Sequence, residues 1–169
     1  WSMTYLKDGK VLTKSAGKDL ALVKTDWKGD YYDKGDFVDT YIRQQLSLGV
    51  GELLYGTGEH FTPFVKNGQS IDIWNEDGGT STEQAYKNIP FYVSNKGYGF
   101  LMNNPAIGKV TFGTNITEWN FESTKQTDYW ITAGDTPAQI EKQYSAVAGR
   151  APMMPEYAMG FWQCKLRYQ

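Results

Sequence analysis

The sequence predicts a mainly β protein, an antiparallel β-sandwich with one helix near its C-terminal end. Short strand-like runs recur along most of the 169 residues, and turn signals separate them. Aromatic residues, which favour the half-buried surface of a sheet, make up 15% of the chain. Many short strands at this spacing are typical of a sandwich. The expected strands are residues 2–6, 10–13, 20–24, 40–48, 53–55, 71–75, 90–94, 98–103, 109–112, 115–122 and 128–132.

Residues 40–48 show the alternation of a strand that has one face in water. Ile42, Leu46 and Leu48 keep a period of two, and Gln44 interrupts it. This pattern predicts that the strand lies on the surface of the sandwich, with its apolar side toward the core.

The clearest hairpin is FYVSNKGYGFLM, residues 91–102. Two aromatic-rich strands flank Asn95 to Gly97, and Gly97 supplies the positive φ that a short loop needs. The segment 24–39 is polar and contains glycines, so it predicts a loop or insert.

The one expected helix lies at residues 136–149. Thr136 is placed as N-cap, Pro137 occupies the first helical position, and Gln139 completes a capping box. Gly149 is expected to end the helix. The residues expected on its apolar face are Ile140, Tyr144 and Val147.

The character of the chain changes after this helix. Residues 157–164 have no clean alternation and are apolar enough to be buried on both faces, which suits a parallel barrel strand. Such a strand has no partner within the sequence, so we expect that the sequence stops at the first strand of a second domain. The predicted domains are a β-sandwich at residues 1–155 and the start of a (β/α)8 barrel at residues 156–169.

Charge and composition exclude several kinds of partner. The net charge is −2 and no basic stripe occurs, so nucleic acid is not an expected partner. No apolar run approaches the roughly 20 residues that span a bilayer. Cys164 is the single cysteine and His60 the single histidine, so we expect no disulfide, no metal site and no cofactor.

The stretch DIWNEDGGTSTEQ, residues 72–84, is the strongest candidate for a site. Asp72 and Trp74 share one face of a predicted strand, whereas Glu76 and Asp77 begin the turn that follows. Nothing in this spacing fixes two carboxylates opposite each other. We therefore expect no autonomous acid–base site in this stretch.

Residues 49–169 resemble glycoside hydrolase family 31, the α-glucosidases and α-xylosidases. The resemblance rests on GELLYGTGEHFTPFVKNGQSIDIWNEDGGTSTEQAYKNIPFYVSNKGYGFLMNNP, on GDTPAQIEKQYSAVAGRAPMMPEYAMGFW and on the spacing between them. The form of the first motif is similar to the bacterial α-xylosidase branch, and residues 1–48 fit the same domain more loosely. The resemblance implies a galactose-mutarotase-like antiparallel sandwich followed by a (β/α)8 barrel that carries the chemistry.

The resemblance also implies a retaining mechanism with two aspartates, a nucleophile and a general acid/base, on later barrel strands. Neither motif occurs here, because no aspartate or glutamate follows Glu156. We therefore expect a parent enzyme that hydrolyses terminal α-linked xylose or glucose, and a chain that has no catalytic residue and is inactive by itself. Its expected partner is an oligosaccharide substrate, reached through the parent enzyme, and self-association is a further possibility.

Four residues are expected to contact this substrate. Asp77 matches the aspartate of a family loop that reaches the sugar, so it is carried over as a hydrogen-bond acceptor. The alternative is that Asp77 caps its own turn. Leu166, Arg167 and Tyr168 follow the Gly-Phe-Trp run, where family members shape the sugar pocket, and they would separate xylosyl from glucosyl rings.

Neighbouring residues are expected to be structural. Asn75 and Glu76 are interpreted as scaffold, and Trp74 as a core residue rather than a platform for sugar. The segment 55–60, YGTGEH, resembles the family's Gly-x-Gly-Glu segment, whose glycines serve a tight turn and close packing. Glu59 is expected to be paired inside the interface with the barrel.

Exposed apolar side chains are expected where the sandwich meets the barrel. The candidates are Phe61, Phe64 and Tyr157, and such a patch favours association or a C-terminal strand folded back on the sheet. Two alternatives remain for the whole chain: a stand-alone carbohydrate-binding module, and a purely structural domain.

Overall fold

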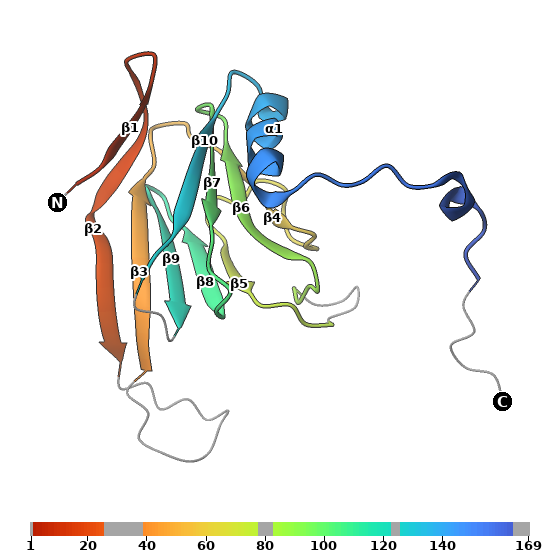
Figure 1. The fold of residues 1–169 in the computed structure, drawn as a ribbon. Helices are drawn as coiled ribbons and strands as arrows, with labels where there is room; N and C mark the ends of the chain where they lie inside the picture. Colours follow the sequence, from red (N-terminus) through yellow and green to blue (C-terminus); the bar gives the residue numbers. More distant parts are fainter. Residues whose placement is uncertain (1, 26–38, 78–82, 123–125, 164–169) are drawn as a thin grey trace.

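The computed structural model describes residues 2–25, 39–77, 83–122 and 126–163. The strands within these ranges form two facing sheets (Figure 1). Every pair of neighbouring strands in these sheets is antiparallel, which confirms the predicted sandwich. The six-stranded sheet contains, in spatial order, β1 (Thr4–Lys7), β2 (Lys10–Thr25), β3 (Asp39–Ser47), β9 (Ile116–Glu122), β8 (Gly108–Phe112) and β5 (Ser70–Ile73). The four-stranded sheet contains β10 (Tyr129–Ala133), β7 (Tyr98–Met102), β6 (Asn88–Ser94) and β4 (Leu54–Gly58).

Strand β2 corrects the sequence prediction, because it joins the two strands expected at 10–13 and 20–24. Ser15 pairs with Leu46 of β3 but Leu20 pairs with Gln44, so the extra residues of β2 bulge out of the ladder. Glycine and polar residues are typical of turns and of bulges alike, and here they form a bulge.

Aromatic rings from both sheets fill the core. The ring of Trp119 on β9 lies 6.2 Å from Tyr92 and 5.7 Å from Phe100, which belong to the opposite sheet. All three side chains are fully buried. Large aromatic side chains bury more apolar area than any others, so this stack contributes a large share of the attraction between the sheets.

One carboxylate is buried at the end of the sandwich where β3 leads into β4. Glu52 accepts hydrogen bonds from the backbone N–H of Gly49 (2.6 Å), from Ser94 Oγ (2.6 Å) and from the Tyr98 hydroxyl (2.7 Å). These donors replace the water that the carboxylate loses on burial. Burial raises the pKa of Tyr98 above its ordinary value, and the neighbouring Tyr92 and Glu52 raise it further.

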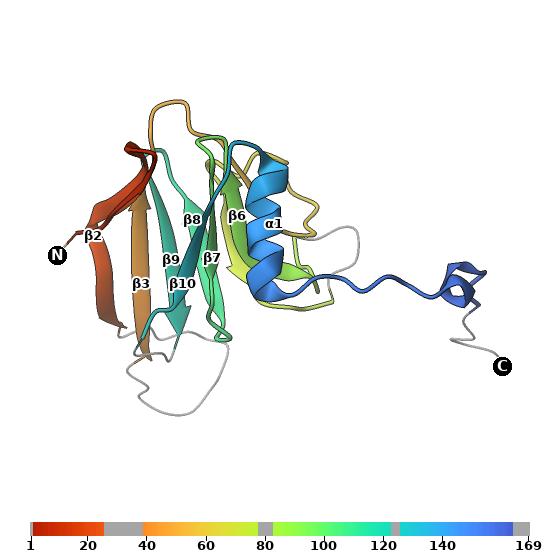
Figure 2. The ribbon, with the colours of Figure 1, turned by 45° about the horizontal axis from the view of Figure 1, so that its top comes forward.

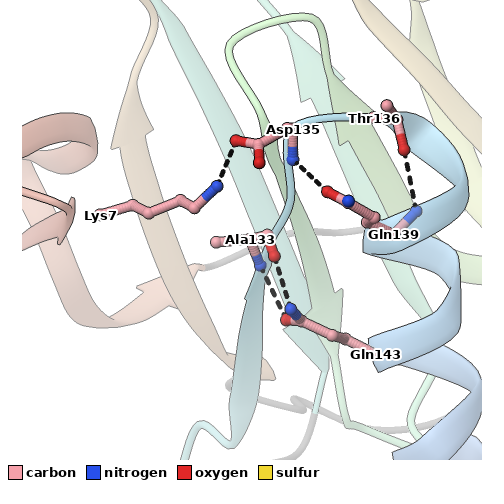
Figure 3. A network of polar contacts seen from close by, with 6 residues as sticks. All are labelled: Lys7, Ala133, Asp135, Thr136, Gln139 and Gln143. Carbon is pink, nitrogen blue, oxygen red and sulfur yellow. Dashed lines mark hydrogen bonds and ion pairs between the residues drawn. The ribbon is translucent and has the colours of Figure 1, made fainter.

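Helix α1 (Pro137–Ala148) lies against β10 and β7, on the outer side of the four-stranded sheet (Figure 2). Its predicted start and end are confirmed. Thr136 Oγ1 accepts the N–H of Gln139 (3.3 Å), and the helix ends at Gly149, which has a φ of 102°. The side chain of Gln139 accepts the N–H of Asp135 (2.7 Å), one residue before the cap (Figure 3).

The predicted apolar face of α1 is confirmed at two of its three positions. Ile140 is 1% exposed, and the ring of Tyr144 stacks 4.2 Å from Phe91. Val147 is 45% exposed, and Ile140 is the one buried residue of the helix.

Polar contacts tie the start of α1 to the sheets. Gln143 donates to the carbonyl of Ala133 (2.6 Å) and accepts the N–H of the same residue (3.0 Å). Lys7 of β1 forms an ion pair with Asp135, so the N-terminal hairpin is joined to the loop that precedes the helix (Figure 3).

The strand predicted over residues 157–164 is not observed. Residues 156–159 form a short 3-10 helix, η1 (Glu156–Met159), and the described chain extends away from the sandwich (Figure 1). Phe161 and Trp162 are 92% and 77% exposed. A parallel strand needs a neighbouring strand for its hydrogen bonds, and no described strand lies beside this segment.

In the part of the chain that the structure describes, no helix has both the length and the apolar character needed to cross a membrane.

Candidate functional site

The candidate loop joins the two sheets, because β5 lies in one sheet and β6 in the other. At the end of β5 the predicted alternation is confirmed: Ile71 and Ile73 are buried, and Asp72 and Trp74 are exposed. The Asp72 carboxylate lies 3.1 Å from Lys109 Nζ, directly opposite on β8. Asp72 is therefore half of a surface ion pair, and it does not pair with a second carboxylate.

The base of this loop is closed by two asparagines. Asn75 Oδ1 accepts the backbone N–H of Asn88 (2.9 Å), and the Asn88 side chain donates to the carbonyls of Trp74 (2.6 Å) and Ala85 (2.8 Å). The N–H of Glu76 donates to the Ala85 carbonyl (3.0 Å). Asn75 is part of the scaffold, as predicted, and Asn88 is a scaffold residue that sequence reasoning missed.

The end of β4 holds the same loop from the other side. The N–H of Glu59 donates to the carbonyl of Lys87 (3.0 Å), and Lys87 Nζ lies 3.1 Å from Glu59 Oε1. Gly58 has a φ of 95°, and a Cβ at this position would lie 2.0 Å from the Lys87 carbonyl oxygen. The tight packing predicted for this glycine is confirmed. Glu59 is paired, as predicted, but on the exposed surface of the described chain.

Asp77 lies on the exposed side of this closed base. It lines a hollow of about 290 Å³, and its carboxylate makes no hydrogen bond with another described residue. A free carboxylate at the edge of a hollow is able to accept two hydroxyl hydrogens. The turn that Asp77 is alternatively expected to cap involves residues 78–82, which lie outside the described residues. The other residues lining the hollow are Glu59, Phe61, Gln84, Ala85, Tyr86 and Lys87.

Trp74 overturns the expectation that it packs in the core. Its side chain is 52% exposed, and it lines a second and larger hollow of about 780 Å³. The reason is the strand alternation itself, because Trp74 shares the outward face of β5 with Asp72.

His60 has a structural contact. Its Nε2 lies 2.8 Å from the carbonyl oxygen of Thr57, which fixes the ring beside the β4 turn. Among the residues that the structure describes, no group of three or more histidine, cysteine, aspartate and glutamate side chains is placed to hold a metal ion. Cys164, Leu166, Arg167 and Tyr168 lie outside the described residues, so their roles stay predictions.

The three apolar residues expected at an interface are exposed. Phe61, Phe64 and Tyr157 are 70%, 78% and 86% exposed. Phe64 packs against Tyr55, with ring centroids 5.2 Å apart. Tyr157 lies in η1, on the extended tail, so it is separate from the other two (Figure 1).

A family model and two related sequences agree on the family to which this chain is similar. The glycosyl hydrolase 31 N-terminal galactose mutarotase-like domain matches residues 1–110. The α-xylosidase XylQ of Lactiplantibacillus pentosus is 37% identical over 164 residues, which cover 96% of this chain and 20% of that protein. An α-xylosidase of Emericella nidulans is 46% identical over 126 residues, or 72% of this chain and 16% of that protein.

Solved structures have the same fold. A family 31 α-xylosidase from a soil metagenome, complexed with xylose, superposes with a TM-score of 0.72 at 36% identity, over 97% of this chain and 25% of that one. A Flavobacterium johnsoniae family 31 dextranase, complexed with glucose, superposes with a TM-score of 0.75 over 95% of this chain and 19% of that one, and its 24% identity supports the fold alone.

The chain thus spans about a fifth of the length of the curated relatives it matches. With a family model that matches most of its length, it belongs to the galactose mutarotase-like N-terminal domains of glycoside hydrolase family 31.

Proposed function

We propose that the chain is the N-terminal sandwich of a retaining α-glycosidase that removes terminal α-linked xylose or glucose, and that Asp77 contacts the sugar. The carboxylates that cleave the bond would lie outside residues 1–169, so the chain alone is inactive. The observation that carries this proposal is an exposed carboxylate, with no hydrogen bond to another described residue, on a loop whose base is tied to both sheets. The names of the relatives, α-xylosidases among them, support the reaction class.

The closed base of the loop suits a binding role. A carboxylate on a free loop loses conformational entropy when it binds, whereas a preorganised one loses less. The contacts of Asn75, Asn88 and Lys87 fix the backbone at residues 74–76 and 85–88, the described base of this loop, before any sugar arrives. A hydrogen bond to a charged acceptor contributes roughly 1.5–3 kcal/mol.

The proposal includes the domain division at residues 155 and 156. Leu166, Arg167 and Tyr168 would then follow the first barrel strand and border the sugar. Xylosyl and glucosyl rings differ by one hydroxymethyl group, and a steric pocket separates groups of this size by roughly 1–3 kcal/mol.

The test compares the chain with the intact enzyme that contains it. The 169-residue chain, free of other hydrolases, is expected to release nothing from an aryl α-xyloside or an aryl α-glucoside. In the intact enzyme, Asp77→Ala is expected to lower kcat/KM for an oligosaccharide by about 10- to 100-fold. Asp72→Ala is the matched control, because it removes an exposed carboxylate that is already paired with Lys109, and it should change kcat/KM less than about twofold.

Two outcomes contradict the proposal. Release of sugar by the chain alone would place catalytic residues within it. Unchanged kcat and KM in Asp77→Ala would favour the alternative of a purely structural domain whose loop does not touch the substrate.

A further inference from the structure

We propose that the chain carries a second carbohydrate-binding site, for a neutral oligosaccharide, in the 780 Å³ hollow beside Trp74. This site goes beyond the proposed function, because it needs neither Asp77 nor any catalytic residue. We refer to it below as the Trp74 hollow.

The Trp74 hollow has the size of a small-ligand site. It lies along the edge strand β5 and beside residues 60–63, and its volume falls within the range of about 300–1,000 Å³ that is usual for such sites. Gln84 and Ala85 border both this hollow and the smaller one at Asp77. The two hollows are therefore neighbours, and substitutions at residues that line only one of them distinguish the two sites.

Trp74 supplies a flat apolar face. Its side chain is 52% exposed although its backbone carbonyl accepts a hydrogen bond from Asn88 (2.6 Å), so the residue is held in place while its indole remains in water. The C–H face of a sugar ring packs well against an indole, and the ligand shields apolar area on both partners. Ile107, 42% exposed, adds apolar area to the same hollow.

The polar lining accepts hydrogen bonds more than it donates them. Glu76 and Glu83 contribute carboxylates, whereas the Asp72 carboxylate is paired with Lys109. Glu76 Oε2 accepts a hydrogen bond from Gln84 Nε2 at 3.1 Å. The side-chain amide of Gln69 donates to the carbonyls of Pro63 and Val65. Its Oε1 is therefore the atom that can accept a hydrogen bond from a ligand. Sugar hydroxyls are donors that match these acceptors.

The same charges restrict the class of ligand. A carboxylate or phosphate on the ligand would face the acidic side chains of Glu76 and Glu83, and like charges repel. Among the described residues these carboxylates do not form a group placed to hold a metal ion, so a bound cation is not the better explanation. A neutral oligosaccharide is the ligand that fits the apolar face and the acceptors together.

The test follows the indole N–H resonances of the ¹⁵N-labelled 169-residue chain, which contains six tryptophans. Titration with a xyloglucan oligosaccharide and with isomaltotriose is expected to shift the Trp74 resonance with a saturable, millimolar or tighter Kd for at least one of them. Trp74→Ala should weaken binding by at least about tenfold. Trp130→Ala is the matched control, because Trp130 is 48% exposed on β10 and lines no part of the hollow. Trp130→Ala and Asp77→Ala should change the affinity less than about twofold.

The proposal is overturned if the Trp74 resonance does not move with either sugar up to about 10 mM, where a millimolar site is largely filled. It is also overturned if Asp77→Ala or Trp130→Ala removes the binding while Trp74→Ala retains it. An acidic oligosaccharide that binds as tightly as the neutral ones would refute the charge argument. If Trp74→Ala does not fold, Trp74→Leu removes the aromatic face while it keeps an apolar side chain, and the same tenfold loss is expected.

Discussion

Replacing Asn88 by alanine tests whether the base of the loop depends on one side chain. The Asn88 amide donates to the carbonyls of Trp74 and Ala85 and to Asn75 Oδ1, at 2.6, 2.8 and 3.1 Å. A typical hydrogen bond contributes a net 0.5–1.5 kcal/mol. The Ala85 carbonyl keeps the N–H of Glu76 as a donor and Trp74 is half-exposed, so we expect a loss of about 1–2 kcal/mol. For a domain of this size that loss corresponds to a melting temperature about 2–8 °C lower.

The assay combines urea unfolding with hydrogen exchange at single amides. In Asn88→Ala the N–H groups of Glu76 and Asn88, both bonded within the base of the loop, should exchange faster than in the wild type, whereas amides in β9 should follow the global stability alone. Asn103→Ala is the matched control, because Asn103 is exposed and, among the described residues, its side-chain amide bonds only to Asp128, so its expected loss is below about 0.5 kcal/mol.

A second substitution at the same position tests the donor role directly. Asn88→Asp keeps the size of the side chain but points a carboxylate at three oxygen acceptors, so it should destabilise more than Asn88→Ala at neutral pH. The difference should shrink below about pH 4, where the protonated carboxyl becomes a donor again. If Asn88→Asp is as stable as the wild type, or Asn88→Ala exchanges normally at Glu76, the amide does not close the loop.

Three further predictions concern the fold. Gly58→Ala should lower the free energy of unfolding by at least about 2 kcal/mol more than Gly9→Ala. Both glycines have a positive φ, but of the two only a Cβ at residue 58 would meet a backbone oxygen. Equal losses in urea unfolding would show that this clash does not occur. Ile140→Ala should cost about 2–4 kcal/mol and Val147→Ala less than about 1 kcal/mol, since the first is buried under the helix and the second is 45% exposed; similar melting temperatures for the two variants would contradict the docking of α1. Because the pKa of Tyr98 is raised in the folded chain, the unfolded chain loses this proton first, and stability should fall above pH 10 by up to about 1.4 kcal/mol per pH unit. Tyr98→Phe should make that fall shallower in unfolding experiments between pH 9 and 11, and an unchanged slope would show that Tyr98 is not the group responsible.

The sandwich and its helix were predictable because their signals are local. Strand alternation at residues 71–74 and the capping residues Thr136 and Gln139 act within a few positions of the chain. The exposure of Trp74 was also predictable from the sequence, because Trp74 shares a strand face with the charged Asp72 and a charged side chain favours a face in contact with water. The usual burial of tryptophan predicted a core position instead, and the strand alternation was the better guide.

Other features depend on distant segments and were not predictable in this way. The role of Asn88 requires the carbonyls of Trp74 and Ala85 to approach it, and the only local sign was an asparagine at the start of a strand, where this residue type is unfavourable. The apolar run after Pro155 suggested a buried strand, but a strand forms only where another chain segment offers hydrogen bonds.

The loop that carries Asp77 starts on one sheet and ends on the other, and this placement has a mechanical consequence. A shift of one sheet against the other would move the two ends of the loop by different amounts, and the hydrogen bonds at its base would transmit that movement to both hollows. Core substitutions at Trp119 or Phe100, which line neither hollow, should therefore alter ligand affinity as well as stability, because the rings that space the sheets also set the spacing of the loop ends.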